Sequence, residues 1–382
     1  MLLSHKFIVL CEDHYNPLTL IRTLSLDGLK PIVVLAGKNP YLITASKYAG
    51  NIVRVETLEE GLEYIINTYG SESQKPFLFS CDDNTATMLD ARYSELKDHF
   101  YFFNGGADKQ IVQYMDKERI LQAAEECGIG IPGSERVRLG ELPSKVNYPV
   151  ITKSIKSTVG GWKSDVFICK NEDELLEAYK HIKSDPVLVE EFIEKDNELC
   201  IDGISFNGGE VVYMPFKVNY IRFTNKAYGN YMTVEPFTDE KLKNKITELF
   251  RKTNFSGIFS IEFLITKSGD LKFLEINFRH STWAQSSRCG GADLPLIWAK
   301  SQLTGRLDTD GLVLEQKPFT AMAELADFND SVRHGNLSGL QWIKDFRKCP
   351  CTYIYDRSDK GPFIATIKNS IGLLVNKFLH RF

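Results

Sequence analysis

The stretch from Ser256 to Arg279 constrains the fold of this chain most, because it predicts a β-hairpin with acidic side chains inside otherwise apolar strands. Two apolar runs, Gly257–Thr266 and Leu271–Asn277, have the composition of strands, and the four polar residues between them have the composition of a turn. The hairpin therefore sets which side chains of the two strands face each other.

The register follows from the length of this turn. If the four polar residues form the loop, cross-strand neighbours share a face, and the predicted pairs are Ile265 with Lys272, Phe263 with Leu274, and Glu262 with Glu275. Asn277 points to the same face as Glu275 because side chains alternate along a strand. A slip of one residue would instead put the two carboxylates on opposite faces.

This acidic pair predicts a metal site. Two adjacent carboxylates repel each other, so that one stays protonated or both share a cation. Oxygen ligands from Glu262, Glu275 and Asn277 suit Mg²⁺, which completes its coordination with phosphates and water. The alternative is a hairpin whose polar face only meets water.

Length and composition place the chain among globular proteins with two or three domains, since it has 382 residues of which 43% are hydrophobic and 25% charged. The net charge of -4 argues against a nucleic-acid-binding protein. The eight cysteines show no CxxC pair or zinc spacing, so we expect reduced thiols in a cytoplasmic protein. We find no signal peptide pattern and no apolar run long enough to span a membrane.

Residues 7–103 alternate between short apolar runs and helical patterns, which predicts a parallel, doubly wound sheet. The expected strands are Phe7–Leu10, Pro31–Leu35, Phe77–Ser80 and Tyr101–Phe103, and the expected helices are Leu18–Leu26, Leu58–Thr68 and Thr85–Leu96. Polar residues follow two of these strands, at Glu12–His14 and Cys81–Asn84, where ligands of such sheets bind. The alternative for Asp82 is a helix N-cap.

The middle of the chain contains candidate nucleotide-binding segments. Asp116 caps a predicted helix, Lys117–Cys127, and a glycine-rich loop at 154–164 with lysines at both ends could close over phosphates. The alternative for the loop is an ordinary hairpin turn. The strand Val187–Phe192 ends in acidic residues that could hold a nucleoside, or could be a solvated strand exit.

In this order, the motifs resemble the ATP-grasp superfamily over about residues 1–300. The residues that carry the resemblance are Asp116-Lys117, Lys153, the glycine loop, Glu190-Glu191-Phe192-Ile193, Glu198, Glu262 and Glu275-Ile276-Asn277-Phe278-Arg279. Two further motifs, Tyr228–Tyr231 and Gly290–Pro295, are similar to the carbamoyl-phosphate-synthetase-like branch, and within it to D-aspartate ligase and related carboxylate–amine ligases.

The resemblance implies a mixed α/β and α+β architecture, namely an ATP-grasp fold preceded by a Rossmann-like pre-ATP-grasp domain. The domains would be 1–106 for the Rossmann-like part, 107–310 for the ATP-grasp part, and 311–382 for a C-terminal extension that completes the fold. Within the ATP-grasp part, the lid would span about 133–194 and the metal hairpin 257–279.

The same resemblance implies roles for individual residues. Those expected to bind ATP are Lys117, Lys153, Thr158, Gly160, Gly161, Lys163, Glu190, Glu191, Phe192, Ile193, Glu198 and Lys217. Glu262, Glu275 and Asn277 would bind one or two Mg²⁺ ions, for which Mn²⁺ could substitute. Arg279 and Lys153 would be catalytic, because they would stabilise the transferring phosphoryl group.

The implied reaction is formation of an amide from a carboxylate and an amine through an acyl phosphate, with release of ADP and phosphate. Candidate substrate contacts are Arg222, Arg288 and Ser281, and the arginine forks match a carboxylate, although either arginine could be a surface residue. The substrate could be an amino acid, a uronic acid, a small peptide or a precursor of a cell wall or surface polysaccharide. Alternatives are a bicarbonate-activating carboxylase and a non-catalytic nucleotide-binding protein, and a homodimer is a possible assembly.

The C-terminal segment Ile364–Phe382 has apolar residues at helical spacing, with Lys368, Lys377 and Arg381 and no acidic residue. A terminal helix of this kind can pack its apolar face on the body of the protein. It can also make peripheral contact with an anionic membrane surface. The sequence favours the packed helix.

Overall fold

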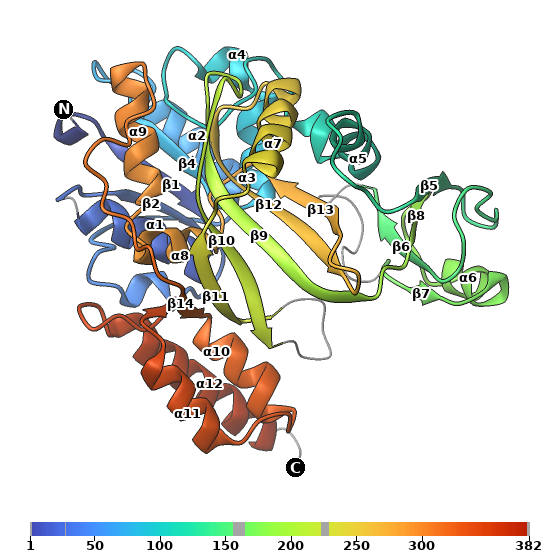
Figure 1. Ribbon diagram of the computed structural model, residues 1–382. Coiled ribbons are helices and arrows are strands. Elements are labelled where there is room, and N and C mark those ends of the chain that lie inside the picture. The colour runs from blue at the N-terminus through green and yellow to red at the C-terminus, as the bar shows by residue number, and fades with distance from the viewer. Residues whose placement is uncertain (1, 27, 156–164, 223–228, 380–382) are drawn as a thin grey trace.

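The computed structural model describes residues 2–26, 28–155, 165–222 and 229–379, with side chains described as far as residue 372. The described residues form three sheets (Figure 1). A four-stranded sheet lies near the N-terminus, a seven-stranded sheet follows in the middle of the molecule, and a second four-stranded sheet projects to one side.

The N-terminal sheet is parallel, as predicted, with strand order β3-β2-β1-β4. Its strands are β1 (Phe7–Cys11), β2 (Ile32–Ala36), β3 (Asn51–Val55) and β4 (Phe77–Ser80). Strand β3 was not predicted. It lies at the sheet edge and is half exposed, and its polar residues interrupt the apolar run by which a buried strand is recognised. The prediction of a strand at Tyr101–Phe103 was wrong, because only Tyr101 pairs there, in an isolated bridge to Phe77.

Helices cover both faces of this sheet, which explains why β1 is apolar at every position. Val9 packs in the same core as Leu18 of α1 (Tyr15–Leu26) and Trp298 of α9 (Leu294–Thr304). Ile8 packs on the other face, with Leu62 of α2 (Leu58–Tyr69). Trp298 packs edge-on against Phe79 at 5.3 Å between ring centroids, so a helix from the last quarter of the chain joins the N-terminal core.

Several helices begin at a residue whose side chain caps the first turn. Thr57 Oγ1 accepts from Glu60 N at the start of α2, and Asp116 Oδ1 accepts from Glu118 N at the start of α5 (Lys117–Glu126). The helix predicted from Thr85 to Leu96 is instead two helices, α3 (Asp83–Ala91) and α4 (Tyr93–Leu96), with a break at Arg92. The remaining helices between the two ends of the chain are α6 (Glu172–Tyr179), α7 (Glu240–Thr253) and α8 (Ala284–Cys289).

The seven-stranded sheet has the order β13-β12-β9-β10-β11-β14-β15 and carries the predicted hairpin at one edge. Its strands are β9 (Lys195–Phe206), β10 (Val211–Arg222), β11 (Tyr231–Pro236), β12 (Gly257–Thr266), β13 (Leu271–Asn277), β14 (Phe319–Met322) and β15 (Cys351–Thr352). The strands of the hairpin have the predicted bounds. Because β14 and β15 come from the last quarter of the chain, the C-terminal segment is part of this sheet.

The second four-stranded sheet has the order β5-β8-β6-β7 and lies inside the range predicted for the lid. Its strands are β5 (Ser134–Val137), β6 (Val150–Ser154), β7 (Ile168–Cys169) and β8 (Val187–Glu191). In Figure 1 it projects to the side of the hairpin formed by β12 and β13. The division into domains at residues 106 and 310 stays a prediction.

A β-bulge changes the predicted register of the hairpin on one side of the acidic pair. Glu262 lies opposite Glu275, as predicted, but Phe263 lies opposite Phe273 rather than Leu274. The predicted pairs Phe263 with Leu274 and Ile265 with Lys272 were therefore wrong, because Leu274 is an extra residue on β13. The bulge lets Phe263 and Phe273 both enter the core while the acidic residues keep their positions.

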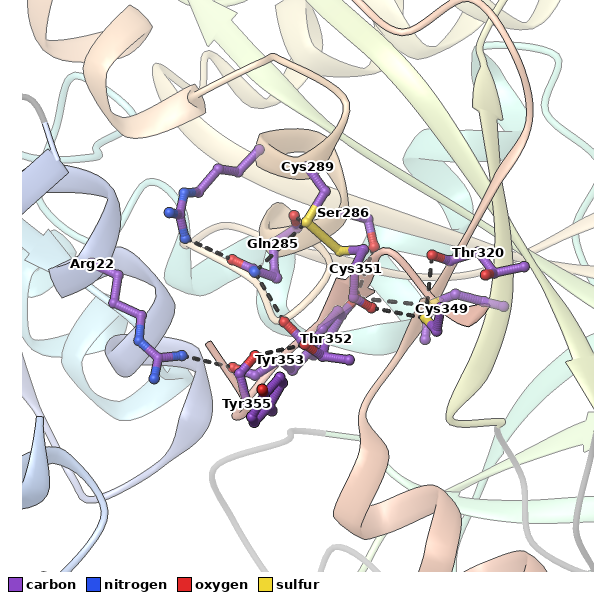
Figure 2. The surroundings of a disulfide bond; sticks show 12 residues. Arg22, Gln285, Ser286, Cys289, Thr320, Cys349, Cys351, Thr352, Tyr353 and Tyr355 are labelled. Carbon is purple, nitrogen blue, oxygen red and sulfur yellow. Dashed lines mark hydrogen bonds between the residues drawn. A yellow bond between two sulfur atoms is a disulfide. The ribbon is translucent and has the colours of Figure 1, made fainter. Parts of the chain in front are cut away.

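A disulfide bond joins Cys289 at the end of α8 to Cys351 on β15, with a Cα–Cα distance of 5.9 Å (Figure 2). The expectation that all eight cysteines are reduced was wrong at this pair. The two cysteines are separated by 62 residues in sequence, so no local spacing revealed them. The other cysteines, among them Cys349 beside this bond in Figure 2, are free thiols.

The C-terminal helices α10 (Glu324–Asp327), α11 (Gly339–Lys348) and α12 (Gly361–Leu379) form one end of the molecule (Figure 1). No helix among the described residues combines the length and apolar character needed to cross a membrane. This end is tied to the N-terminal sheet by a buried ion pair, in which Arg22 Nε lies 2.9 Å from Asp359 Oδ2. Arg22 also donates to the carbonyl oxygen of Ile354 at 3.0 Å.

We expect Arg22→Ala to lower the free energy of unfolding by about 3–5 kcal/mol, because it leaves the Asp359 carboxylate buried without its cation. Urea unfolding of the full chain measures this change. The control is Arg306→Ala, which removes an exposed pair with Asp310 and should cost under about 1 kcal/mol. Equal effects of the two substitutions would contradict a structural role of the buried pair.

Candidate functional site

The acidic pair lies on the hairpin as the sequence predicted. Glu262 is the cross-strand neighbour of Glu275, and Ser260 is the neighbour of Asn277. Asn277 Nδ2 donates to Ser260 Oγ at 3.2 Å and lies 3.4 Å from Glu262 Oε1. The three predicted metal ligands therefore gather at one edge of the seven-stranded sheet.

The electrostatics of this group fit a divalent cation. Burial raises the pKa of Glu262 well above its ordinary value, and the negative charges of Glu275 and Glu198 raise it further. Two carboxylates and one amide oxygen are hard oxygen ligands that suit Mg²⁺. No cluster of three or more His, Cys, Asp or Glu side chains suited to a metal is found in the described part of the chain. Mg²⁺ held by these three side chains would take phosphate and water oxygens as its other ligands.

Arg279 joins this group to the N-terminal sheet. Its Nε donates to Asp83 Oδ1 at 2.7 Å, and its Nη2 donates to Asn277 Oδ1 at 3.0 Å. Asp83 is the first residue of α3, directly beyond the carboxyl end of β4, where ligands of parallel sheets bind. The side chain that caps α3 is Asp82, which accepts from Thr85 N at 2.8 Å, so the N-cap alternative for Asp82 is confirmed.

The segment after Arg279 is fixed by Asn16, a buried residue that the sequence did not single out. Asn16 Nδ2 donates to the carbonyl oxygens of His280 and Cys81, at 2.9 Å and 2.8 Å. Next to it, desolvation and the charge of Arg279 lower the pKa of His14 to about 4, so its ring is neutral near pH 7. The only signal for these residues was their place after predicted strands.

Strand β6 and helix α5 bring two lysines to the acidic group. Lys153 on β6 forms an ion pair with the buried Glu190 on β8. Burial lowers the pKa of Lys117, the charge of Lys153 lowers it further, and the charges of Glu275 and Glu190 oppose this shift. Lys117 and Lys153 are therefore close enough to repel each other, and an anion such as a phosphate would relieve this repulsion.

The segment predicted to hold a nucleoside leaves the second four-stranded sheet at the end of β8. Glu190 pairs with Ile151 of the neighbouring strand, and the next two backbone amides are already bonded. Glu191 N donates to Gly133 O at 2.8 Å, and Phe192 N donates to Pro149 O at 2.9 Å. The roles of Glu190, Glu191, Phe192 and Ile193 stay predictions.

Strand β9 contributes two acidic residues to the same surface of the sheet. Glu198, predicted to bind ATP, is buried and forms an ion pair with Lys195. Burial raises the pKa of Glu198, and the charge of Glu275 raises it further while Lys195 lowers it. Because Cys200 on β9 is the neighbour of Glu262, Glu198 and Asp202 flank the acidic pair on the next strand.

Asp202 was missed by the sequence interpretation, because a lone acid in an apolar strand has no recognisable spacing. It is buried, and its Oδ1 accepts from Ser281 Oγ at 2.7 Å. Burial raises the pKa of Asp202 from 3.8 to about 7, although the hydrogen bond from Ser281 and the charge of Arg279 lower it. Ser281, a predicted substrate contact, is thus buried against a carboxyl group beside Arg279.

Two other predicted contacts are engaged with carboxylates of the protein. Arg222 lies at the end of β10 and donates to Asp327 Oδ2 at 2.6 Å and to Asp345 Oδ2 at 2.8 Å. Lys217 Nζ lies 3.3 Å from Glu235 Oε2 on β11. A substrate or phosphate at either residue would have to compete with these partners.

Arg288, the other predicted carboxylate clamp, lies on α8 in a half-buried position. Its Nη1 donates to Gln285 Oε1 at 3.3 Å, and its Nε is 3.9 Å from Asp293 Oδ1. Burial lowers the pKa of Arg288, which the charges of Asp293 and Asp356 oppose. The predicted loop residues Thr158, Gly160, Gly161 and Lys163 lie outside the described residues.

Part of this chain matches a known protein family and curated relatives. Residues 123–285 match the family model described as the ATP-grasp domain. Biotin carboxylase of Nostoc sp. is 26% identical over 208 residues, which are 50% of this chain and 46% of that protein. The chain spans less than half the length of this curated relative.

Solved structures show the same fold. The biotin carboxylase domain of 2-oxoglutarate carboxylase from Hydrogenobacter thermophilus, solved with MgADP, ADP and bicarbonate, has a TM-score of 0.64 at 16% identity. The alignment covers 83% of this chain and 74% of that one. An L-amino acid ligase from Bacillus licheniformis has a TM-score of 0.61 at 14% identity, with 83% and 78% covered.

We expect Asp202→Asn to change how stability depends on pH. Since the pKa of this carboxyl group is about 7 in the folded protein and 3.8 ordinarily, ionisation costs stability as pH rises through that window. The difference in free energy of unfolding between the variant and the wild type should therefore be up to about 4 kcal/mol more favourable to the variant at pH 8 than at pH 4. Unfolding by urea at both pH values, without nucleotide or metal, measures this difference.

The exposed Asp310→Asn serves as the control, because its side chain lies at the surface beside Arg306. Its stability should follow the wild type at both pH values within about 0.5 kcal/mol. Parallel pH profiles of wild type and Asp202→Asn would show that the Asp202 carboxyl is not held protonated in the folded chain.

Proposed function

Because the chain carries an ATP-grasp domain and has the ATP-grasp fold, we propose that it is an ATP-dependent ligase that joins a carboxylate to an amine. The single observation that carries this proposal is the pairing of Glu262 with Glu275 beside Asn277. A protein that had lost catalysis would have no reason to keep a repelling pair of carboxylates whose charge needs a cation. This favours an enzyme over a non-catalytic nucleotide-binding protein.

The proposed reaction activates a carboxylate that is otherwise a poor electrophile. The γ-phosphate of ATP is transferred to the carboxylate, ADP leaves, the amine attacks the acyl phosphate, and phosphate leaves as the amide forms. Mg²⁺ bound by Glu262, Glu275 and Asn277 would neutralise charge on the phosphates. The protein contributes mainly position and charge, and this fits the described lysines and arginine around the acidic pair.

Each cationic side chain has a role in this proposal. Lys117 and Lys153 would hold phosphate oxygens, so that Lys153 exchanges its Glu190 partner for the nucleotide. Arg279 would leave Asp83 to stabilise the phosphoryl group in transfer and then the acyl phosphate. The glycine loop from Thr158 to Lys163 would exclude water, and the segment after Glu190 would hold adenine.

A bicarbonate-activating reaction is the second candidate, supported by the likeness to biotin carboxylase. It would use the same ATP and metal contacts and differ in the carboxylate that is phosphorylated. The likeness to an L-amino acid ligase equally supports amide formation. The two candidates differ in whether bicarbonate or an organic carboxylate, such as an amino acid or a uronic acid, stimulates turnover.

The proposed partners are a small-molecule carboxylate and a small-molecule amine. Arg288 is our first candidate for contact with a substrate carboxylate, because its two described polar contacts are long. A homodimer is proposed because the similar biotin carboxylase domain from Hydrogenobacter thermophilus was solved as a dimer. Peripheral contact of α12 with a membrane would add a further partner. A cytoplasmic location is proposed because the reaction consumes ATP.

We expect phosphate release from MgATP to require both a carboxylate and an amine. A panel of amino acids, small peptides and uronic acids, with bicarbonate as a separate arm, would identify the substrates. Glu275→Gln should reduce the stimulated rate by about 100-fold or more, because it removes a charge from the metal site. The matched control Glu248→Gln lies on the exposed face of α7 and should keep the rate.

Stimulation by bicarbonate without an amine would favour the carboxylase. Full activity of Glu275→Gln would contradict the assignment of the metal site. Tight MgATP binding without turnover on any substrate of the panel would argue that the chain binds nucleotide without acting as a ligase on such small molecules.

We further expect Lys153→Met to weaken MgATP binding by about 10-fold or more, because one charge-assisted contact to phosphate is lost. Isothermal titration calorimetry measures the dissociation constant, and thermal melting verifies that the variant folds despite the unpaired Glu190. Lys180→Met is the control, since that ammonium pairs with Glu177 at the surface. Unchanged affinity in folded Lys153→Met would show that Lys153 does not contact the nucleotide.

A further inference from the structure

Helix α12 turns apolar side chains toward solvent. Ile364, Ile367 and Ile371 are all exposed, and their spacing of three and four residues puts them on one face of the helix. The packed side of the helix uses other residues, since Phe363 stacks on Phe346 at 6.3 Å and packs edge-on against Tyr355 at 5.3 Å. The expectation that α12 buries its apolar residues on the body was wrong for these three isoleucines.

The neighbouring helix α11 has the same property. Its Trp342 and Phe346 pack inward, stacked at 5.2 Å, while Leu340 is 77% exposed and Ile343 is also exposed. Exposed aliphatic side chains at helical spacing on two adjacent helices are uncommon on a protein surface that meets only water. Such a surface indicates a partner.

Basic residues surround these apolar side chains. Lys368 is exposed on the same face of α12, between Ile367 and Ile371. Lys344 and Arg347 are exposed on α11 next to Ile343. We refer to Leu340, Ile343, Lys344 and Arg347 of α11 with Ile364, Ile367, Lys368 and Ile371 of α12 as the basic apolar face.

The charge of the whole segment agrees with this surface. Residues 333–382 contain nine Lys and Arg, three Asp and no Glu, which is a net charge of +6, whereas the rest of the chain has -10. Two of the three aspartates are taken by arginines of the body, Asp345 by Arg222 and Asp359 by Arg22. These two aspartates therefore do not neutralise the basic residues of this end of the molecule.

We propose that the basic apolar face docks on an anionic lipid membrane, with the isoleucines in the headgroup region and the basic residues at the lipid charges. A helix with apolar side chains beside lysine and arginine binds such an interface by burial and by electrostatic attraction. A second copy of this chain fits less well, because a two-fold interface would bring the same positive face against itself. The inference does not depend on the proposed ligase activity.

The position of the face in the molecule suits docking. The C-terminal helices form one end of the structure, while the lid strands β5 to β8 lie elsewhere (Figure 1). The base of α12 is fixed to the body by Asp359, which also accepts from Ser46 Oγ at 2.6 Å. Docking through α11 and α12 would thus anchor the whole chain.

Co-sedimentation of the full chain with lipid vesicles tests this proposal. One vesicle preparation is phosphatidylcholine alone, and the other contains roughly a third phosphatidylglycerol, a negatively charged lipid. We expect at least about 10-fold tighter binding to the anionic vesicles, and a loss of binding as salt is raised. Lack of any preference for anionic vesicles would overturn the proposal.

Two substitutions separate the apolar and the charged contributions. Ile371→Glu and Lys368→Glu should each weaken binding to anionic vesicles by about 10-fold or more. The matched control is Ile168→Glu in the lid, whose side chain is 52% exposed against 55% for Ile371, and it should bind like the wild type. Thermal melting verifies that each variant is folded.

Light scattering distinguishes the competing partner. If the wild type is a dimer that Ile371→Glu converts to a monomer, a second copy covers this face and the membrane proposal is wrong. Equal vesicle binding by wild type, Ile371→Glu and Lys368→Glu would also overturn it, because the basic apolar face would then not be the contact surface.

Discussion

The repulsion between Glu262 and Glu275 is the interaction around which the candidate site is arranged. The hairpin fixes both residues as cross-strand neighbours, so the backbone prevents them from moving apart. Around them, three cations arrive from three elements: Lys117 from α5, Lys153 from β6 and Arg279 from the chain after β13. This arrangement, with two carboxylates surrounded by three cationic side chains, is the one expected for a metal ion that lies between carboxylates and phosphates.

Two of these cations form ion pairs with carboxylates of the chain. Lys153 pairs with Glu190 and Arg279 with Asp83, so each has a carboxylate partner that an incoming phosphate could replace. Such an exchange keeps each cation paired, but it takes the lysine away from the buried Glu190 carboxylate, a cost that the contacts of the bound anion must offset. Because Asp83 follows β4, the exchange at Arg279 also involves the N-terminal sheet.

The sequence predicted the hairpin, the acidic pair and the parallel N-terminal sheet, because these depend on local runs and patterns of apolar and polar residues. It could not predict the bulge at Leu274. Either Leu274 or Phe273 could have pointed inward, and the outcome depends on which of the two packs with Phe263 in the folded core. The disulfide between Cys289 and Cys351 and the buried Asp202 were missed for a related reason. Their partners are distant in sequence and adjacent only after the seven-stranded sheet has formed.

The direction in which the C-terminal helix turns its apolar side chains could not be predicted from the sequence either. Apolar residues at helical spacing are equally expected of a helix that packs on a core and of one that lies on a membrane surface. The spacing of Ile364, Ile367 and Ile371 therefore cannot decide which way the face points. The fold decides it, because the stacking of Phe363 on Phe346 and the burial of Asp359 against Arg22 set the rotation of α12. With those contacts made, the isoleucines have no core to enter and face outward beside Lys368.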